Sequence, residues 1–424
     1  MRRSFAEAIA YAAMFGLAEM FFVPDAVRLG AGPLAIAVVV GLPLAAGAAG
    51  ASVGLRLVGW SSRRRPVVVG GVVGQALVLC ALATAEAMTL NTPALLVAAA
   101  CAYHFCAQLV AGPWSAWLGD IVPARIRGRY FSNRTRAVHL TSFVALLAGG
   151  LILQWLQPPL GTAGGSGFAV LFATAALARV VSAALLATTP EGRRRPDEAP
   201  VATSLRPQWR VPADRLMLGA GLIYLAVYVG SPFFTPFMLE ELRLDYAQYT
   251  LATAAMVACK VLSLRRWGHA VDRFGAAAVY RLAIVLVALI PVPWLFVQGA
   301  VGASLAQAVS GFAWAAHEIA LFSVVLETTP SPQRPRVYAL QSISTGLGQL
   351  GGSLAGALIV VWLSDTRQLF AVSSGLRLLA AAAVVWALAE TFRTVRIGRR
   401  RLLLRVIGLR VSGGAVHRPM DRDD

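Results

Sequence analysis

Several ionisable side chains lie in the middle of long apolar stretches, where they could bind protons or a polar solute. Glu318 directly follows His317 and lies four residues after Trp314. Residues four apart share one face of a helix, so Trp314 and Glu318 should be neighbours, with His317 displaced by about 100°. A charge inside a membrane is costly unless it faces water or a partner. We therefore predict that Glu318 carries protons, with Glu19 as the next candidate.

Further polar or aromatic residues interrupt apolar stretches in the same way and are candidate site residues: Tyr11, Tyr103, His104, Gln108, Tyr224 and Tyr228. The tyrosines could equally pack between helices, and His104 could be a neutral histidine bonded to a neighbouring helix. Glu19 lies toward the end of its stretch and could reach the interface. Lys260, the only lysine, is expected to extend toward lipid headgroups. Two arginines at matching positions are expected to bond backbone carbonyls or an acid: Arg179 and Arg377.

The elements that carry these residues are predicted to be membrane-spanning helices. Of the 424 residues, 58% are hydrophobic and 14% are charged, whereas a soluble protein carries about 25% charged residues. Runs of about 20 apolar residues, each long enough to cross a bilayer, recur along the chain. We expect an all-α membrane protein with twelve spans, at 5–24, 33–57, 66–86, 93–118, 138–157, 167–188, 216–238, 246–264, 279–299, 303–327, 338–363 and 369–392.

The net charge of +18 is distributed in a way that favours membrane orientation over nucleic-acid binding. Arginines gather in the loops that follow even-numbered spans, as in Arg63–Arg65 and Arg193–Arg195, while the opposite loops hold few. This asymmetry predicts that both termini are cytoplasmic. The excess charge should meet anionic lipid headgroups of the plasma (inner) membrane.

An internal repeat divides the chain into two related halves. Residues 120–156 match residues 327–363 at a constant offset of 207, which pairs Asp120 with Glu327 and Arg129 with Arg336. A weaker echo pairs Phe21-Phe22-Val23-Pro24 with Phe233-Phe234-Thr235-Pro236. A duplicated half implies a two-fold axis along the membrane normal. The predicted domains are a first six-helix bundle, a cytoplasmic linker, a second bundle and a basic tail: 1–188, 189–215, 216–392 and 393–424.

Several function classes find no support in the sequence. The four cysteines fall inside predicted spans, so no disulfide framework is implied. The histidines and cysteines lack metal-ligand spacing, and no phosphate-binding glycine loop ends in Lys-Ser/Thr. We therefore expect neither a catalytic site nor a cofactor or metal.

A short loop motif carries a family resemblance. Gly268-His-Ala-Val-Asp272-Arg273-Phe-Gly275 follows the eighth predicted span, and its G-x-x-x-D-R-x-G pattern resembles the signature loop of the major facilitator superfamily. The resemblance implies two bundles of six helices around a central cavity, with alternating access. It also implies that the first, fourth, seventh and tenth spans line the cavity, and the candidate site residues lie on these spans.

The resemblance has two departures. The equivalent loop after the second span reads Gly59-Trp-Ser-Ser-Arg63-Arg64-Arg65-Pro66 and lacks the aspartate and the last glycine. The first half is therefore expected to close its gate through Asp120 with Arg127 and Arg129, or else this loop simply faces lipid and solvent. In the second half, Asp272 is expected to lie near the end of a helix or near an arginine. The fifth span also lacks the long glycine-proline pattern of drug–proton antiporters, although it contains Gly149-Gly150.

The resulting functional prediction is a secondary transporter of a small organic molecule, working as a monomer by alternating access. Proton coupling and export are the favoured details. One alternative is an uptake symporter for a sugar- or nucleoside-like solute. The other is a membrane sensor or assembly factor that does not transport.

Overall fold

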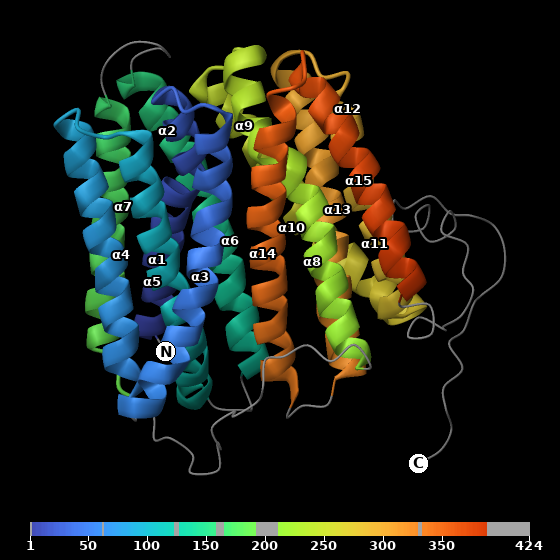
Figure 1. The fold of residues 1–424 in the computed structure, drawn as a ribbon. Coiled ribbons are helices and arrows are strands. Elements are labelled where there is room, and N and C mark those ends of the chain that lie inside the picture. Colours follow the sequence, from blue (N-terminus) through green and yellow to red (C-terminus); the bar gives the residue numbers. More distant parts are fainter. Residues whose placement is uncertain are drawn as a thin grey trace, which may run out of the picture. The chain divides into compact units, whose positions relative to one another are not determined.

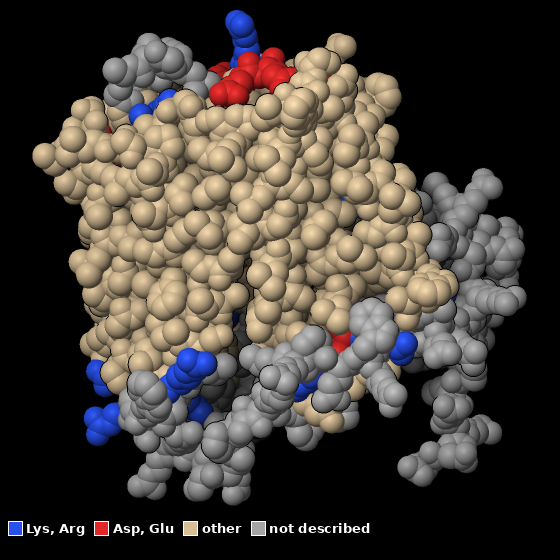
Figure 2. Space-filling model, viewed as in Figure 1, with Lys and Arg blue, Asp and Glu red and all other residues tan. Residues whose placement is uncertain are grey.

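The computed structural model describes residues 2–61, 63–122, 127–157, 165–191, 211–329 and 333–387. Every regular element in these ranges is a helix (Figure 1). Twelve stretches of these helices are long and apolar enough to cross a membrane, which confirms the predicted all-α class. Figure 2 shows acidic side chains at one end of the helices, basic side chains mostly at the other, and an uncharged belt between them.

The chain forms two compact units. The first unit combines Met1–Ala202, Tyr228–Ala254 and Gln349–Thr366, and the second combines Thr203–Val227, Ala255–Gly348 and Arg367–Asp424. In the first unit, α1 packs against α6 and α7, α3 against α5, and α4 against α5 and α7. In the second, α11 packs against α13.

The first six long helices, with the short elements between them, are α1 (Arg2–Ala18), η1 (Glu19–Phe21), α2 (Phe22–Arg28), α3 (Pro33–Ser61), α4 (Arg64–Ala87), α5 (Pro93–Ile121), α6 (Arg127–Leu156) and α7 (Ser166–Ala187). They are followed by α8 (Pro212–Gly230), η3 (Ser231–Phe233), α9 (Phe234–Pro236), η4 (Phe237–Glu241) and α10 (Tyr246–Phe274). The last are α11 (Ala276–Leu289), α12 (Pro291–Trp294), α13 (Gly299–Thr328), α14 (Arg334–Val360) and α15 (Thr366–Ala387).

The repeat seen in the sequence also appears in the local backbone. The 3-10 turn η1 ends at Phe21 and α2 begins at Phe22; η3 ends at Phe233 and α9 begins at Phe234. Both phenylalanine pairs therefore mark the point where a membrane-spanning helix changes its winding. Such local changes of helix type often occur at functional positions, and Glu19 begins the first of them.

Helix starts follow ordinary capping rules. The hydroxyl oxygen of Thr92 accepts a hydrogen bond from the Leu95 N–H (3.2 Å), and Pro93 takes the first position of α5, where proline is well tolerated. Helix α11 begins after Gly275, whose φ of +83° lies in a region that favours glycine. The last residue of the G-x-x-x-D-R-x-G motif is therefore a glycine for a backbone reason.

Candidate functional site

In the second unit, an ion pair joins the middles of two membrane-spanning helices. Lys260 Nζ of α10 lies 2.5 Å from Glu318 Oε1 of α13. The two side chains are 30% and 48% exposed. The helices approach closely one turn from Lys260 and two turns from Glu318, because a Cβ on Gly311 would lie only 2.1 Å from the Met256 carbonyl oxygen. The expectation that Lys260 reaches for headgroups is wrong: its ammonium group bonds Glu318 instead.

Aromatic rings surround the neighbouring histidine. His317 is 0% exposed, and the ring centroids of Trp314, Tyr224 and Tyr280 lie 5.3, 5.9 and 5.6 Å from its own. Neither His317 ring nitrogen has a hydrogen-bond partner among the described residues. Three predicted site residues, Trp314, Tyr224 and His317, therefore lie together, while the adjacent Glu318 contacts Lys260. We call these residues with Lys260 and Tyr280 the Glu318 cluster.

In the first unit, the carboxyl group of Glu19 lies among aromatic and thioether groups. The Tyr103 hydroxyl is 3.3 Å from Glu19 Oε2 and 3.1 Å from the Met14 sulfur. Among the described residues, Glu19 forms no ion pair. Its neighbourhood therefore offers a hydroxyl but no cation. We call Glu19, Met14 and Tyr103 the Glu19 cluster.

A chain of buried polar groups leads away from this cluster. The Gln75 amide donates to the Tyr103 carbonyl oxygen (3.3 Å), and the Arg179 guanidinium donates to the Gln75 side-chain oxygen. Arg179 also donates to Ser182, whose hydroxyl donates to Glu7 (3.3 Å). The same arginine lies over the Tyr11 ring, 5.3 Å from its centroid. Sequence reasoning missed Gln75 and Glu7 as site neighbours, because their partners are on other helices.

The remaining predicted cavity residues have ordinary contacts. His104 stacks edge-on against Tyr103 at 5.4 Å between centroids, and Tyr228 accepts a hydrogen bond from Gln349 (3.2 Å). Gln108 is exposed on α5. These three residues belong to the first unit and bring no ion pair to its described part.

Each half contains a buried ion pair at its first and fifth membrane-spanning helices. Arg134 bonds Glu7 at 2.8 Å, and Arg336 bonds both carboxylate oxygens of Asp214 at 2.7 Å. The sequence repeat aligns Arg336 with Arg129, whereas these contacts make Arg134 its counterpart. Sequence comparison missed this correspondence because the paired acids, Glu7 and Asp214, lie outside the repeated block.

Of the two predicted gate loops, the structure describes the side chains of the second. The second motif lies at the end of α10, with Gly268, Asp272 and Arg273 in the helix and Gly275 directly after it. Asp272 is exposed and has no hydrogen bond or ion pair to any residue in the described ranges. Arg273 lies against the Phe274 ring, 5.7 Å from its centroid. The side chains of three other predicted gate residues lie outside the described residues: Asp120, Arg127 and Arg129.

In the first half, a distant acid lies at the start of the helix that follows the altered motif. Glu191 Oε1 accepts the backbone N–H groups of Arg64 (2.6 Å) and Arg65 (3.1 Å), at the start of α4. A carboxylate is favourable at this end of a helix because it satisfies free N–H groups and faces the positive end of the dipole. Trp117 holds the same segment by donating to the Pro190 carbonyl oxygen (3.1 Å).

No group of three or more histidine, cysteine, aspartate or glutamate side chains suited to a metal ion occurs within the described part of the chain. The Glu318 cluster contains an ion pair. The Glu19 cluster contains a carboxyl group that has no ion-pair partner among the described residues. These arrangements can bind a polar solute and a proton.

Comparison with known proteins agrees with this architecture. The sequence model of the Major Facilitator Superfamily matches residues 216–411. No curated protein matches the chain by sequence. Among solved structures, a D-xylose-proton symporter is 15% identical with a TM-score of 0.69, covering 90% of this chain and 96% of its own.

Two further structures are similar over most of their length. The nucleoside transporter NupG, in a mutant form, is 12% identical with a TM-score of 0.68, covering 91% of this chain and 99% of its own. A bacterial homologue of the iron transporter ferroportin is 17% identical with a TM-score of 0.64, covering 91% and 98%. Identities this low show the fold alone. The chain therefore resembles the major facilitator superfamily, by sequence over residues 216–411 and by fold over most of its length.

Proposed function

We propose that the protein is a secondary transporter that moves a small organic solute across the membrane by alternating access. The observation that carries the proposal is the ion pair between Lys260 and Glu318. It lies midway along two candidate membrane-spanning helices and is nevertheless partly exposed. Exposed charges at that depth are stable only when they face water or a polar ligand. A partly exposed ion pair between the inner parts of two such helices is what a solute pathway would require.

The Glu318 cluster indicates the kind of solute. Its ion pair offers an ammonium group and a carboxylate, and Trp314 and Tyr224 offer apolar ring faces beside them. Binding sites for small molecules combine such apolar walls with a few polar groups that fix orientation. The proposed solute is therefore moderately polar, with hydrogen-bonding groups and an apolar or ring portion.

Proton coupling is part of the proposal, and the structure changes the favoured residue. The sequence favours Glu318, but Glu318 has Lys260 as a counter-ion. Glu19 has the Tyr103 hydroxyl and no ion-pair partner in the described ranges. A carboxyl group without a counter-ion in an apolar place gains most from taking up a proton. We propose Glu19 as the proton carrier and Glu318 as a solute-binding residue.

The favoured direction is export from a plasma (inner) membrane, by a monomer in contact with membrane lipids and with both termini cytoplasmic. Uptake of a sugar- or nucleoside-like solute is the alternative, which the similarity to the xylose symporter and the nucleoside transporter favours. The arginine asymmetry of the loops supports the orientation.

The test is counterflow in proteoliposomes. A thermal-shift screen against metabolites and drugs would first identify a stabilising compound, and that compound would be radiolabelled. Protein-containing vesicles preloaded with the unlabelled compound should accumulate the label transiently, and a Lys260→Met variant should do so much less. Absence of counterflow for every stabilising compound would favour a sensor or assembly factor.

A further inference from the structure

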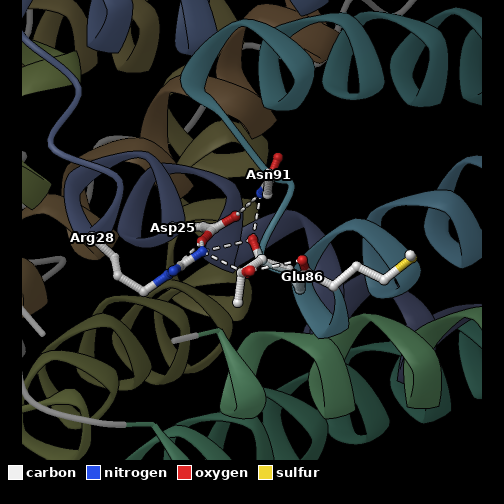
Figure 3. A network of polar contacts seen from close by, with 6 residues as sticks. Asp25, Arg28, Glu86 and Asn91 are labelled. Atoms are coloured by element: carbon white, nitrogen blue, oxygen red, sulfur yellow. Dashed lines mark hydrogen bonds and ion pairs between the residues drawn. The ribbon is translucent and has the colours of Figure 1, made fainter. Parts of the chain in front are cut away.

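Four polar side chains form a second charged cluster in the first unit, separate from both clusters above (Figure 3). Asp25 and Arg28 belong to α2, Glu86 lies at the end of α4, and Asn91 lies in the loop before α5. Asp25 is 0% exposed and Glu86 is 2% exposed. The cluster is therefore closed to bulk solvent, although it lies at the ends of its helices.

A single guanidinium group serves both carboxylates. Arg28 donates to Asp25 Oδ1 from Nε (2.9 Å) and from Nη2 (2.6 Å). The same Nη2 atom lies 2.6 Å from each carboxylate oxygen of Glu86. The Asn91 amide nitrogen donates to Asp25 Oδ2 (3.0 Å) and to Glu86 Oε1. Because one nitrogen atom contacts both acids, the carboxylates are close neighbours.

The packing around the cluster leaves it little freedom to relax. The Phe168 ring covers the guanidinium, with its centroid 5.0 Å from Arg28 Cζ. A Cβ on Gly165 would lie 1.8 Å from Glu86 Oε2, so a larger residue there would displace the Glu86 carboxylate. Such tight packing limits water inside the cluster, and like charges in a dry site are strongly disfavoured.

The charges of this cluster do not balance when both acids are ionised. Two carboxylates against one guanidinium leave one negative charge in a buried place. The Tyr246 ring lies 5.9 Å from the Phe168 ring, between centroids, and its hydroxyl has no hydrogen-bond partner among the described residues. Glu19, in the preceding η1, bonds Tyr103 instead. The ends of α3, α5 and α9 that pack on α2 carry no acidic or basic residue.

The hydrogen bonds also lack one donor. Ionised carboxylates only accept, and the Asn91 side-chain oxygen, a further acceptor, is buried without a partner in the described ranges. A proton on either acid would remove the excess charge and supply the missing donor. Two carboxylates held this close commonly share one proton, because both cannot ionise together.

We propose that Asp25 and Glu86 together bind one exchangeable proton. A proton from water adds to a carboxylate oxygen of the pair, which takes the cluster from one net negative charge to neutrality. Release returns the proton to water and leaves Arg28 facing two charged acids. The protonated pair holds α2, α4 and the loop at Asn91 together, and proton release loosens that junction.

Two measurements on the full-length purified protein test this proposal. The first is the infrared C=O stretch of protonated carboxylic acids, recorded across a pH series in a Glu19→Gln background. That background keeps the test independent of the proton carrier proposed above. We expect a band that disappears as the pH rises and that is absent in both Glu86→Gln and Asp25→Asn. Glu241→Gln removes an exposed acid and should leave the band unchanged.

The second measurement needs no substitution and remains valid if those variants fail to fold. Dicyclohexylcarbodiimide reacts with protonated carboxyl groups in apolar places, and peptide mass spectrometry locates the adduct. We expect one adduct per chain on Asp25 or Glu86, not on both, with a yield that falls as the pH rises. No adduct on either residue, or a band that survives in both folded variants, would overturn the proposal.

Discussion

The carboxyl groups of Glu19 and Glu318 are chemically alike but lie in opposite surroundings. Glu318 is half exposed and bonds an ammonium group at 2.5 Å. Glu19 lies beside a tyrosine hydroxyl and a thioether, and it forms no ion pair with a described residue. A neighbouring cation stabilises the charged form of a carboxyl group, whereas an apolar surrounding stabilises the neutral form. This difference supports the proposed roles, solute binding for Glu318 and proton exchange for Glu19.

The largest expected effect comes from Glu19→Gln. A glutamine keeps the size and the contact with Tyr103 but cannot exchange a proton. We expect pH-driven accumulation in proteoliposomes to fall to the level of protein-free vesicles, while solute exchange at equal pH continues. Glu318→Gln is the matched variant and should retain pH-driven movement at saturating solute. If Glu318→Gln abolishes pH-driven accumulation and Glu19→Gln does not, Glu318 is the proton carrier.

The next effect concerns solute binding at the ion pair. Lys260→Met should weaken binding of the transported compound about tenfold or more, equivalent to about 1.4 kcal/mol, as measured by calorimetry. The loss in stability should stay below about 1 kcal/mol, because partly exposed ion pairs contribute little. The swapped variant, Lys260→Glu with Glu318→Lys, restores the pair in reverse. If the swapped variant folds normally but still binds the solute weakly, solute binding depends on which helix carries the positive charge.

A third effect concerns stability and compares the two buried ion pairs. Asp214→Asn leaves Arg336 without its bidentate partner and should lower the free energy of unfolding by about 3 kcal/mol. Glu7→Gln should have a similar effect on Arg134 in the other half. Asp272→Asn changes an exposed aspartate and should leave the melting temperature unchanged while impairing transport. Equal melting temperatures for all three variants would contradict a structural role for the two buried pairs.

The smallest effect concerns the motif glycines. Gly275→Ala places a side chain at a φ of +83° and should cost about 1–3 kcal/mol. Gly268→Ala is the control, because Gly268 lies in a helix with no atom within 4 Å of an added Cβ. It should be nearly neutral in a thermal melt. A greater loss for Gly268→Ala would mean that the motif acts through contacts outside these helices.

The sequence predicted the helices well and their lateral contacts poorly. Apolar runs fix where a helix must cross a membrane, so ranges such as 33–57 and 93–118 lie within α3 and α5. Contacts between helices depend on rotation and register, which composition does not encode. Lys260 and Glu318 are 58 residues apart, and Glu7 and Arg134 are 127 apart. No local spacing rule could pair them.

Three of the missed residues, Asp25, Glu86 and Glu191, lie near helix ends. Glu86 and Asp25 lie near the ends of their membrane-spanning helices. Charged residues at such positions usually reach water, so their types and spacing do not indicate a buried cluster. The polar composition around Glu191 indicates a linker, whereas its carboxylate accepts backbone N–H groups at the start of α4.

The presence of one lysine in the chain also gives the protein a natural chemical label. Apart from the amino terminus, Lys260 carries the only primary amine. Acylating reagents should therefore modify a single side chain, 30% exposed and midway along its helix. Small amine-reactive dyes added from one side of sealed vesicles would then report which side that amine faces. Its reaction rate would follow the opening and closing of the protein without any engineered cysteine.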